Sequence, residues 1–468
     1  SDVLWHYNLS ARHLDKLCER VDTFSVSGDG ERLVVRHRDD TIVVPSSHKV
    51  DDDDPAYIRV DLTRLRRTVN PRAEWRQMFD ENGRLMASHY WREDMNGVDW
   101  DSVLNRYRPL VDLCHVVDDL HDILWETVAE LNTSHSYVSA SGAAGDSDMR
   151  AGLLGADVSS GNDGAKVVRV IPGESSDPRA WSPLRAAGVA VTEGDVIVAV
   201  DGRKVGADGN LGELLEGSAG RVVELTVRRG ENERQVAVVP MADEAPLRYH
   251  DWVASRRRYV EEHSGGRLGY LHVPDMVSDG WAELHRQIGE ATRHEGVIAD
   301  VRFNHGGHTS QLVVERLARR VVGWDYSRWY ATADTYPQNA VRGPIVMVTN
   351  QWAGSDGDIV AAATQAMGYA KVIGERSWGG VVGIDGRFDL VDGTSVTQPR
   401  YAGWYGSYGW GVENHGVDPD IVVTVSPEDW EADCDVQLDA AIAECLRQLD
   451  DKPAATAPEL PGPAFDRC

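Results

Sequence analysis

Ser355 is the residue around which the chemistry of this sequence can be organised. It follows a short apolar run, Ile345–Val348, and a tight turn ending in Gly354-Ser355. The next residues, Asp356–Met367, carry apolar side chains at helical spacing and stop at Gly368. This pattern predicts a strand, a turn and a helix, with Ser355 where the helix begins. A serine at that point has an exposed hydroxyl beside helix N–H groups that can stabilise an oxyanion. The alternative is a serine that only caps the helix.

A nucleophilic serine needs a base, a group that orients the base, and N–H donors for the oxyanion. His135 is the candidate base, because it stands between a predicted helix and a predicted strand; the alternative is a structural histidine. The candidate donors are the backbone N–H of Asp356 and that of a glycine in Gly306-Gly307, where a missing side chain lets the backbone approach a substrate. Spacing alone does not bring these distant segments together.

The composition limits the class of protein. The chain has 468 residues, and its content of 42% hydrophobic residues is ordinary for a multi-domain globular protein. Its net charge of −27 argues against nucleic acid and anionic membranes as partners. No apolar run is long enough to span a membrane and no signal peptide is visible, so we expect a cytoplasmic protein. Five widely spaced cysteines indicate a reducing compartment.

We expect no metal and no cofactor. His305 and His308 are three residues apart but have no third ligand nearby in the sequence. The acidic run Asp51–Asp54 lacks the alternating spacing of a calcium loop, and a solvated linker is the better interpretation.

The elements that must position the chemistry fall into successive segments. Residues 20–45 alternate short strands and turns and are typical of part of a propeller blade or of an added sheet edge. Residues 71–131 are predicted helical, with one continuous helix over 110–131. The run Gly194-Asp195 to Asp201-Gly202 resembles the core of a PDZ domain, a module that binds peptide ends by adding a strand to a sheet edge or serves as a rigid spacer. Residues 246–445 alternate strands and helices, which predicts a largely parallel sheet, with strands including 387–390 and 395–398.

Several motifs together resemble the tricorn proteases and their broader relatives, the tail-specific (C-terminal processing) peptidases. The order of helical segment, PDZ-like domain and α/β catalytic domain is similar too, over about residues 56–445. The motifs are Ser134-His135, Asp300-Val301-Arg302-Phe303-Asn304 with Gly306-Gly307, Ala353-Gly354-Ser355-Asp356-Gly357-Asp358, and Val412-Glu413-Asn414-His415-Gly416-Val417-Asp418-Pro419-Asp420.

The resemblance implies a Ser–His–Ser–Glu tetrad. By this likeness Ser355 is the nucleophile, His135 the general base, Ser134 the residue that orients His135, and Glu413 the residue that holds Ser134. It also implies an oxyanion hole made by the N–H groups of Gly307 and Asp356, with Gly306 as the alternative. Asp325 stands where the family places an acidic residue, lent by a neighbouring subunit, that selects basic side chains; the alternative is an ordinary surface aspartate.

The expected protein is therefore an α/β serine peptidase with a ClpP/crotonase-like catalytic domain and an inserted PDZ-like domain. We expect it to cut short peptides downstream of a processive protease, as a homo-oligomer that the resemblance makes a hexamer. The predicted divisions are a propeller-like segment with an acidic linker (1–55), a helical catalytic subdomain (56–145), a PDZ-like domain (146–242), an α/β catalytic domain (243–450) and a flexible tail (451–468). Two alternatives stay open: a tail-specific peptidase, whose Ser–Lys dyad is disfavoured because residues 356–367 contain no lysine, and a non-catalytic peptide-binding scaffold.

Overall fold

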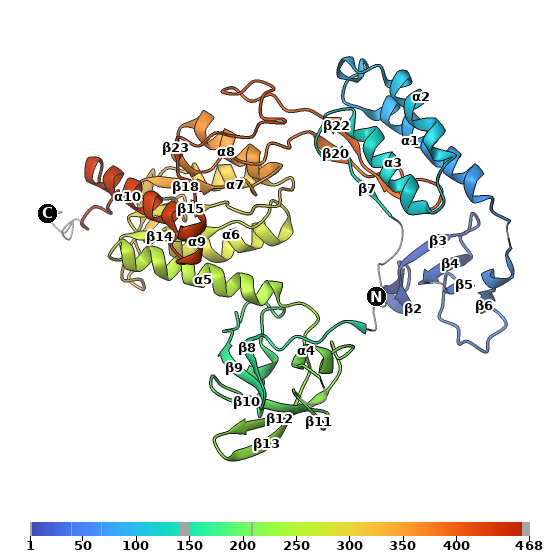
Figure 1. Cartoon of the computed structure of the whole chain (residues 1–468), viewed down its shortest axis with the longest axis horizontal. Coiled ribbons are helices and arrows are strands. Elements are labelled where there is room, and N and C mark those ends of the chain that lie inside the picture. Colours follow the sequence, from blue (N-terminus) through green and yellow to red (C-terminus); the bar gives the residue numbers. More distant parts are fainter. Residues whose placement is uncertain (1, 39, 67, 141–148, 207–208, 461–468) are drawn as a thin grey trace. The chain divides into compact units, whose positions relative to one another are not determined.

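A computed structural model describes residues 2–38, 40–66, 68–140, 149–206 and 209–460 (Figure 1). The chain divides into two compact units, Ser1–Glu74 and Trp75–Cys468, of which the second holds the proposed chemistry. Among the described residues, no helix is both long and apolar enough to cross a membrane.

The first unit is built from antiparallel strands. A hairpin of β1 (Asp2–Asn8) and β2 (His13–Val21) precedes a four-stranded sheet in the order β3 (Thr23–Val26), β4 (Arg32–His37), β5 (Asp40–Pro45) and β6 (Ile58–Val60). The predicted meander over residues 20–45 is confirmed as β3 to β5. The β1–β2 hairpin and the fourth strand, β6, were not predicted.

Three helices come next in the chain, and here one prediction is wrong. The helices are α1 (Pro71–His89), α2 (Trp100–Val111) and α3 (Val117–Ala129), so the continuous helix predicted over 110–131 is in fact two. The carboxylate of Asp119 accepts the N–H groups of His115 at 2.7 Å and Val116 at 3.2 Å. This side chain starts a new helix at the position where apolar spacing alone predicted a continuation.

Later residues return to complete this helical subdomain. Strand β21 (Ser395–Val396) pairs with β7 (Val138–Ser139), and β22 (Gln398–Tyr401) pairs with β20 (Gly383–Asp385). The strand predicted over 387–390 does not form: Leu390 instead packs, with Val396, into the core of the helical subdomain. This return of the chain matters because β7 begins three residues after His135.

The PDZ-like segment is a separate antiparallel sheet. Its strands run in the order β13 (Asn232–Val238), β12 (Val223–Arg229), β10 (Val196–Val200), β9 (Gly164–Val170) and β8 (Ala156–Gly161), with β11 (Arg203–Lys204) beside β10 and one short helix, α4 (Leu211–Leu214). A core of Val, Leu and Ile side chains fills it.

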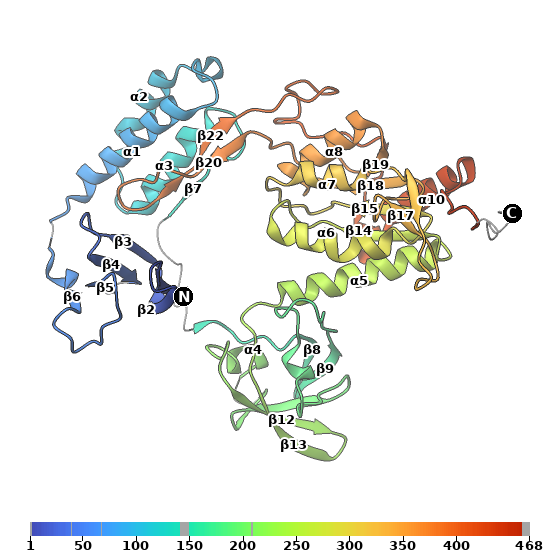
Figure 2. The same cartoon turned by 180° about the vertical axis from the view of Figure 1, so that it is seen from behind.

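The catalytic domain is a parallel sheet covered on both faces, as the alternating pattern predicted. The strands lie in the order β14 (Leu268–His272), β15 (Gly296–Asp300), β18 (Ile345–Thr349), β19 (Ala370–Gly374) and β23 (Ile421–Val422), and every neighbouring pair is parallel. Helices α6 (Ser278–Ala291), α7 (Ser310–Leu317) and α8 (Asp356–Met367) pack on one face, and α5 (Ala245–His263) and α10 (Val436–Asp451) on the other (Figures 1 and 2). Both faces are therefore buried, which explains why the strands read as unbroken apolar runs.

The parallel strands all begin on one side of the sheet and end on the other. We call the side where the strands end the carboxyl edge, and the side where they begin the amino edge. A hairpin of β16 (Gly323–Asp325) and β17 (Asp334–Tyr336) follows α7, and the short helix α9 (Pro427–Glu431) precedes α10. After α10, Ala455 in the first part of the tail exchanges hydrogen bonds with Arg342 at 2.8 and 3.3 Å.

Candidate active site

Ser355 lies at the carboxyl edge, between β18 and α8. The prediction of a helix over 356–367 that ends at Gly368 is confirmed residue for residue. Ser355 itself has φ 58° and ψ −120°, a conformation that a residue with a side chain rarely adopts. Its side chain makes no capping hydrogen bond to α8, so the alternative of a simple helix cap does not hold. A half-buried hydroxyl on a strained strand-to-helix turn is the arrangement expected of a nucleophile.

The glycine turn after β15 lies directly against Ser355. A Cβ on Gly306 would stand 2.5 Å from the Cβ of Ser355 and 3.0 Å from its Oγ, so only glycine fits there. The N–H of Gly306 donates to Asn304 Oδ1 at 2.9 Å. Within the described residues, the N–H groups of Gly307 and Asp356 have no hydrogen-bond acceptor. The two donors predicted first are therefore open, whereas the alternative donor, Gly306, is occupied.

Glu413, Ser134 and His135 form a continuous hydrogen-bonded chain. The two carboxylate oxygens of Glu413 accept the N–H of Ser134 at 2.7 Å and its Oγ–H at 3.0 Å. The Oγ of Ser134 lies 2.9 Å from Nδ1 of His135. Because the hydroxyl proton of Ser134 goes to Glu413, its oxygen accepts Nδ1–H from the imidazole. That tautomer leaves Nε2 of His135 unprotonated and able to act as a base.

The far end of this chain is anchored by backbone groups. Oε2 of Glu413 also accepts the N–H of Val381 at 2.8 Å and of Val382 at 3.0 Å. Four donors, two from Ser134 and two from these valines, therefore hold one carboxylate. Such a carboxylate has one orientation, and it fixes Ser134 in turn.

The backbone on either side of His135 is held by the returning strand. His135 has φ 62°, and Thr397, located between β21 and β22, donates its hydroxyl to the His135 carbonyl and accepts the N–H of Tyr137 at 2.7 Å. Burial lowers the pKa of the imidazole from 6.5, and the negative charge of Glu413 opposes that shift only in part. The neutral imidazole, which is the form a general base requires, therefore persists at neutral pH.

Trp378 lies between His135 and the turn that precedes Ser355. Its ring centroid lies 5.5 Å from that of His135 at an interplanar angle of 80°, and a Cβ on Gly354 would come within 2.8 Å of the same ring. No hydrogen bond joins His135 to Ser355 among the described residues. Catalytic hydrogen bonds in enzymes without substrate are often long and tighten only when substrate binds.

Asp358 is a buried residue whose role the sequence did not reveal. Its carboxylate accepts the Ser377 hydroxyl and the N–H groups of Gly379 at 2.8 Å and Gly380 at 3.2 Å, and these residues flank Trp378. The side chain is 0% exposed, and burial raises its pKa to about 6. The sequence feature that could have indicated this role is the second acid of Ser355-Asp356-Gly357-Asp358. An acid in the first turn of a helix is common, however, and the buried position of Asp358 depends on the loop that carries Trp378, which is distant in sequence.

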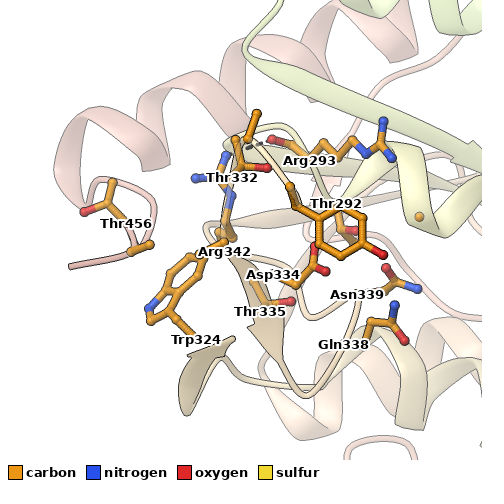
Figure 3. A pocket seen from close by; sticks show the side chains of 15 residues that line it. Thr292, Arg293, Trp324, Thr332, Asp334, Thr335, Gln338, Asn339, Arg342 and Thr456 are labelled. Atoms are coloured by element: carbon orange, nitrogen blue, oxygen red, sulfur yellow. Dashed lines mark hydrogen bonds between the residues drawn. The ribbon is translucent and has the colours of Figure 1, made fainter. Parts of the chain in front are cut away.

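Asp325, the predicted specificity residue, lies away from Ser355 in the same chain. It is exposed in β16, and its neighbour Trp324 lines a cavity of about 940 Å³ together with Arg293 and Arg342 (Figure 3). Arg293 and Arg342 shortly precede β15 and β18, so this cavity is at the amino edge. A five-residue strand such as β18 separates the two edges by about 16 Å. Asp325 and Ser355 of one chain are thus not brought together.

Other residues bear on the alternatives. His305 and His308 are both exposed, and the described residues contain no group of three side chains suited to hold a metal ion. The lone lysine between residues 243 and 450 is Lys371, whose Nζ lies 3.3 Å from Asp420. Lys371 is in β19 next to its first residue, at the amino edge, so it does not reach Ser355 to form a Ser–Lys dyad.

Three segments of the chain match known protein families. Residues 267–423 match Peptidase family S41, residues 152–243 match the Tricorn protease PDZ domain, and residues 71–129 match the Tricorn protease C1 domain. The chain is 56% identical over 463 residues to Tricorn protease homolog 1 of Streptomyces coelicolor, with 98% of this chain and 43% of that protein covered. The chain belongs to the tricorn-type serine peptidases of family S41.

More distant tricorn proteins support the same assignment. Tricorn protease of Thermoplasma acidophilum is 35% identical over 448 residues, covering 96% of this chain and 41% of the relative. A solved tricorn protease structure has a TM-score of 0.87 at 34% identity, with 96% of this chain and 43% of that chain covered. The present chain thus spans about two fifths of the length of these tricorn proteins. The broader link predicted to tail-specific peptidases is also found: the carboxy-terminal processing protease CtpB of Bacillus subtilis is 24% identical over 58% of this chain.

Proposed function

We propose that this tricorn-type chain hydrolyses short peptides through the tetrad Ser355, His135, Ser134 and Glu413. The observation that carries the proposal is the uninterrupted chain of hydrogen bonds from Glu413 through Ser134 to Nδ1 of His135. It sets the imidazole tautomer that leaves Nε2 free. A structural histidine has no need of such a relay.

The reaction follows from these groups. Oγ of Ser355 attacks the peptide carbonyl while Nε2 of His135 takes the hydroxyl proton, and the Glu413–Ser134 pair stabilises the imidazolium that forms. The N–H groups of Gly307 and Asp356 donate to the developing oxyanion. His135 then returns the proton to the leaving amine as the C–N bond breaks. A water molecule, activated by the same imidazole, releases the acyl group from Ser355.

The remaining features extend the same proposal. Asp325 selects basic side chains at the cleavage site of a neighbouring subunit; its exposure in a hairpin at the amino edge suits an action between subunits rather than within one. The enzyme then works as a homo-oligomer, a hexamer by resemblance, on peptides released by a processive protease in the cytoplasm. We also infer a ClpP/crotonase-like fold for the catalytic domain, a propeller origin for the β3–β6 sheet, and the predicted divisions after residues 55, 145, 242 and 450.

The test is hydrolysis of quenched peptides with an internal arginine or lysine. The parent chain should cleave them, and Ser355→Ala and His135→Ala should each lose activity by at least about 10⁴-fold. Asp325→Asn should reduce cleavage after basic residues more than cleavage elsewhere. Persistence of hydrolysis in purified Ser355→Ala would refute the assignment of the nucleophile.

The tail-specific alternative makes a different prediction about substrate ends. A tail-specific peptidase depends on a free carboxyl terminus, whereas a tricorn-type peptidase acting on short peptides is limited by peptide length. Matched substrates that are amidated at the C-terminus, or fused there to a folded domain, separate the two. Loss of cleavage on amidation alone would favour the tail-specific function.

A further inference from the structure

A second cavity lies at the carboxyl edge, on the side of the sheet covered by α5 and α10. Its volume is about 680 Å³. Four aromatic side chains line it: Trp252 of α5, Phe303 after β15, Trp352 after β18 and Trp430 of α9. We call it the aromatic pocket. Ligands of open parallel sheets bind outside the carboxyl ends of the strands, and this pocket has that position whereas the larger amino-edge cavity does not.

Three of these rings are exposed in a way that packing does not explain. Trp430 is 77% exposed, Trp352 64% and Phe303 38%. Single exposed aromatic residues are common, but three around one cavity are a feature of binding sites. Rigid rings also provide contact area at little cost in side-chain entropy.

Backbone strain points the same way. Phe303 has φ 59°, which is unfavourable for a bulky side chain. Its N–H donates at 3.0 Å to Oδ1 of Asn350, which also accepts the N–H of Trp352 at 3.2 Å. One buried amide therefore holds two of the four aromatic residues in place. Strain of this kind persists where the surroundings enforce it, most often at functional sites.

The pocket shares its two loops with the reaction centre. The N–H of Gly354 donates to the Asn304 carbonyl at 3.0 Å, which joins the loop of Phe303 to the loop of Trp352. Phe303 precedes Gly307 by four residues and Trp352 precedes Ser355 by three. At up to ~3.6 Å per residue, the pocket lies within about 15 Å of the oxyanion donors, a distance that about four residues of an extended peptide cover.

The two cations that line the pocket are already paired. Arg302 pairs with Asp300 at 2.7 Å and with Asp435 at 2.8 Å, and Arg256 pairs with the same Asp435 at 3.2 Å. Further carboxylates at the rim, among them Glu375 and Asp429, add negative charge. An uncharged, apolar side chain therefore suits the aromatic part of this pocket better than an anion.

We propose that the aromatic pocket is a substrate subsite that takes an apolar side chain of the peptide, within about four residues of the bond cleaved at Ser355. This assignment rests on the peptidase function proposed above. It gives the enzyme a second point of recognition, beside the selection of basic residues by Asp325. The contribution is realised only by peptides long enough to reach from Ser355 to the pocket.

Two substrate classes test it. One is a minimal arylamide of a single blocked arginine; the other is a set of quenched heptapeptides with one arginine, in which Leu or Ser is placed at each position in turn. In the parent chain, Leu at one position should raise kcat/KM about tenfold over Ser.

Trp352→Ala and Trp430→Ala should abolish that preference and leave kcat/KM for the arylamide within about twofold of the parent value. Both residues are exposed, so these variants should fold. Trp5→Ala, 50% exposed in the first unit, is the control and should keep the preference.

A native cysteine offers an independent test. Cys434 is exposed and lines the pocket. Its alkylation with N-phenylmaleimide should lower heptapeptide cleavage and spare the arylamide, and Cys434→Ser should be resistant. In the Ser355→Ala variant, a heptapeptide with Leu at the preferred position should slow the alkylation, followed by mass spectrometry of the Cys434 peptide.

Several outcomes would overturn the subsite. No Leu preference in the parent chain, or equal preference in Trp352→Ala and Trp430→Ala, would do so. A change of oligomeric mass in these variants, with the preference kept, would assign the pocket to contact between copies of the chain. Failure of the parent chain to cleave even the arylamide would instead strike at the proposed peptidase function, and the two failures are thereby distinguished.

Discussion

The carboxyl and amino edges of the parallel sheet differ in which residues take left-handed backbone conformations. At the amino edge, positive φ occurs at Gly265, Gly266, Asn339 and Gly368, residue types that adopt it at little cost. At the carboxyl edge it occurs at Gly306, Gly307 and Gly374 but also at Phe303 and Ser355.

The difference shows where the fold accepts strain. A positive φ at a residue other than glycine or asparagine costs on the order of 1–3 kcal/mol, and the amino edge avoids that cost by its choice of residues. The carboxyl edge bears it at the candidate nucleophile and at the lining of the neighbouring pocket. Backbone strain and cavity size therefore point to different edges, because the larger of these two cavities is at the unstrained edge.

The largest effect should come from Ser355→Gly. Glycine accepts φ 58° without strain and Ser355 makes no capping hydrogen bond, so we expect the free energy of unfolding to rise by about 1 kcal/mol. Peptide hydrolysis should fall by at least about 10⁴-fold. Denaturant unfolding and kcat/KM on one sample check both, and Gly368→Ala at the amino-edge end of α8 is the control, which should lose stability and keep activity.

Glu413→Gln should reduce kcat/KM by roughly 10²-fold. We expect a smaller loss than from removal of a group in direct contact with the imidazole, because Ser134 lies between Glu413 and His135. An amide retains one acceptor but loses the charge that stabilises the imidazolium. Steady-state kinetics with an arginine arylamide measure the loss. An effect below threefold would mean that Glu413 only supports the fold.

The pH dependence should follow His135. Its pKa is lowered from 6.5, so the neutral base persists as the pH falls and is lost only below that value. We therefore expect kcat/KM to be level at neutral pH and to decline on the acid side with an apparent pKa below 6.5. A pH–rate profile of the parent chain tests this, and an acid limb centred above 6.5 would contradict the burial argument.

Asp358→Asn should have a smaller effect, about tenfold on kcat/KM, through the loop that carries Trp378. In the variant, the amide nitrogen would face O–H and N–H groups whose hydrogen bonds the carboxylate now accepts. Leaving such a buried donor without an acceptor costs about 1–3 kcal/mol. Peptide hydrolysis and tryptophan fluorescence together report activity and loop position. Unchanged values of both would remove Asp358 from the account.

Lys371→Met should have the smallest effect. The Lys371–Asp420 pair is exposed at the amino edge, where such a pair contributes at most about 1 kcal/mol. We expect kcat/KM within about twofold of the parent value. A large loss of activity would reopen the Ser–Lys alternative.

The sequence predicted local structure at the nucleophile well. The strand, the turn and the helix at Ser355 depend on neighbouring residues. The helix bounds agree with the structure, and the strand ends one residue later than predicted, at Thr349. The helix predicted over 110–131 failed because Asp119 supplies a local cap that apolar periodicity does not detect.

Residue spacing alone could not predict which distant segments of the chain meet in the site. Ser134 and Glu413 are 279 residues apart in sequence, and only the resemblance to tricorn proteases placed them in one predicted site. Asp358 and Trp378 escaped notice because the role of each depends on a loop distant from the Ser355 motif. The aromatic pocket likewise takes its walls from α5, α9 and two strand ends, which no single motif contains.

We propose that Ser355 is a nucleophile activated by His135. This can be tested by labelling with a serine-reactive organophosphonate and locating the modified peptide by mass spectrometry. We expect label on Ser355 in the parent chain and none in His135→Ala. Label on another serine, equal labelling of Ser355 in His135→Ala, or no label on a folded, oligomeric sample would contradict it.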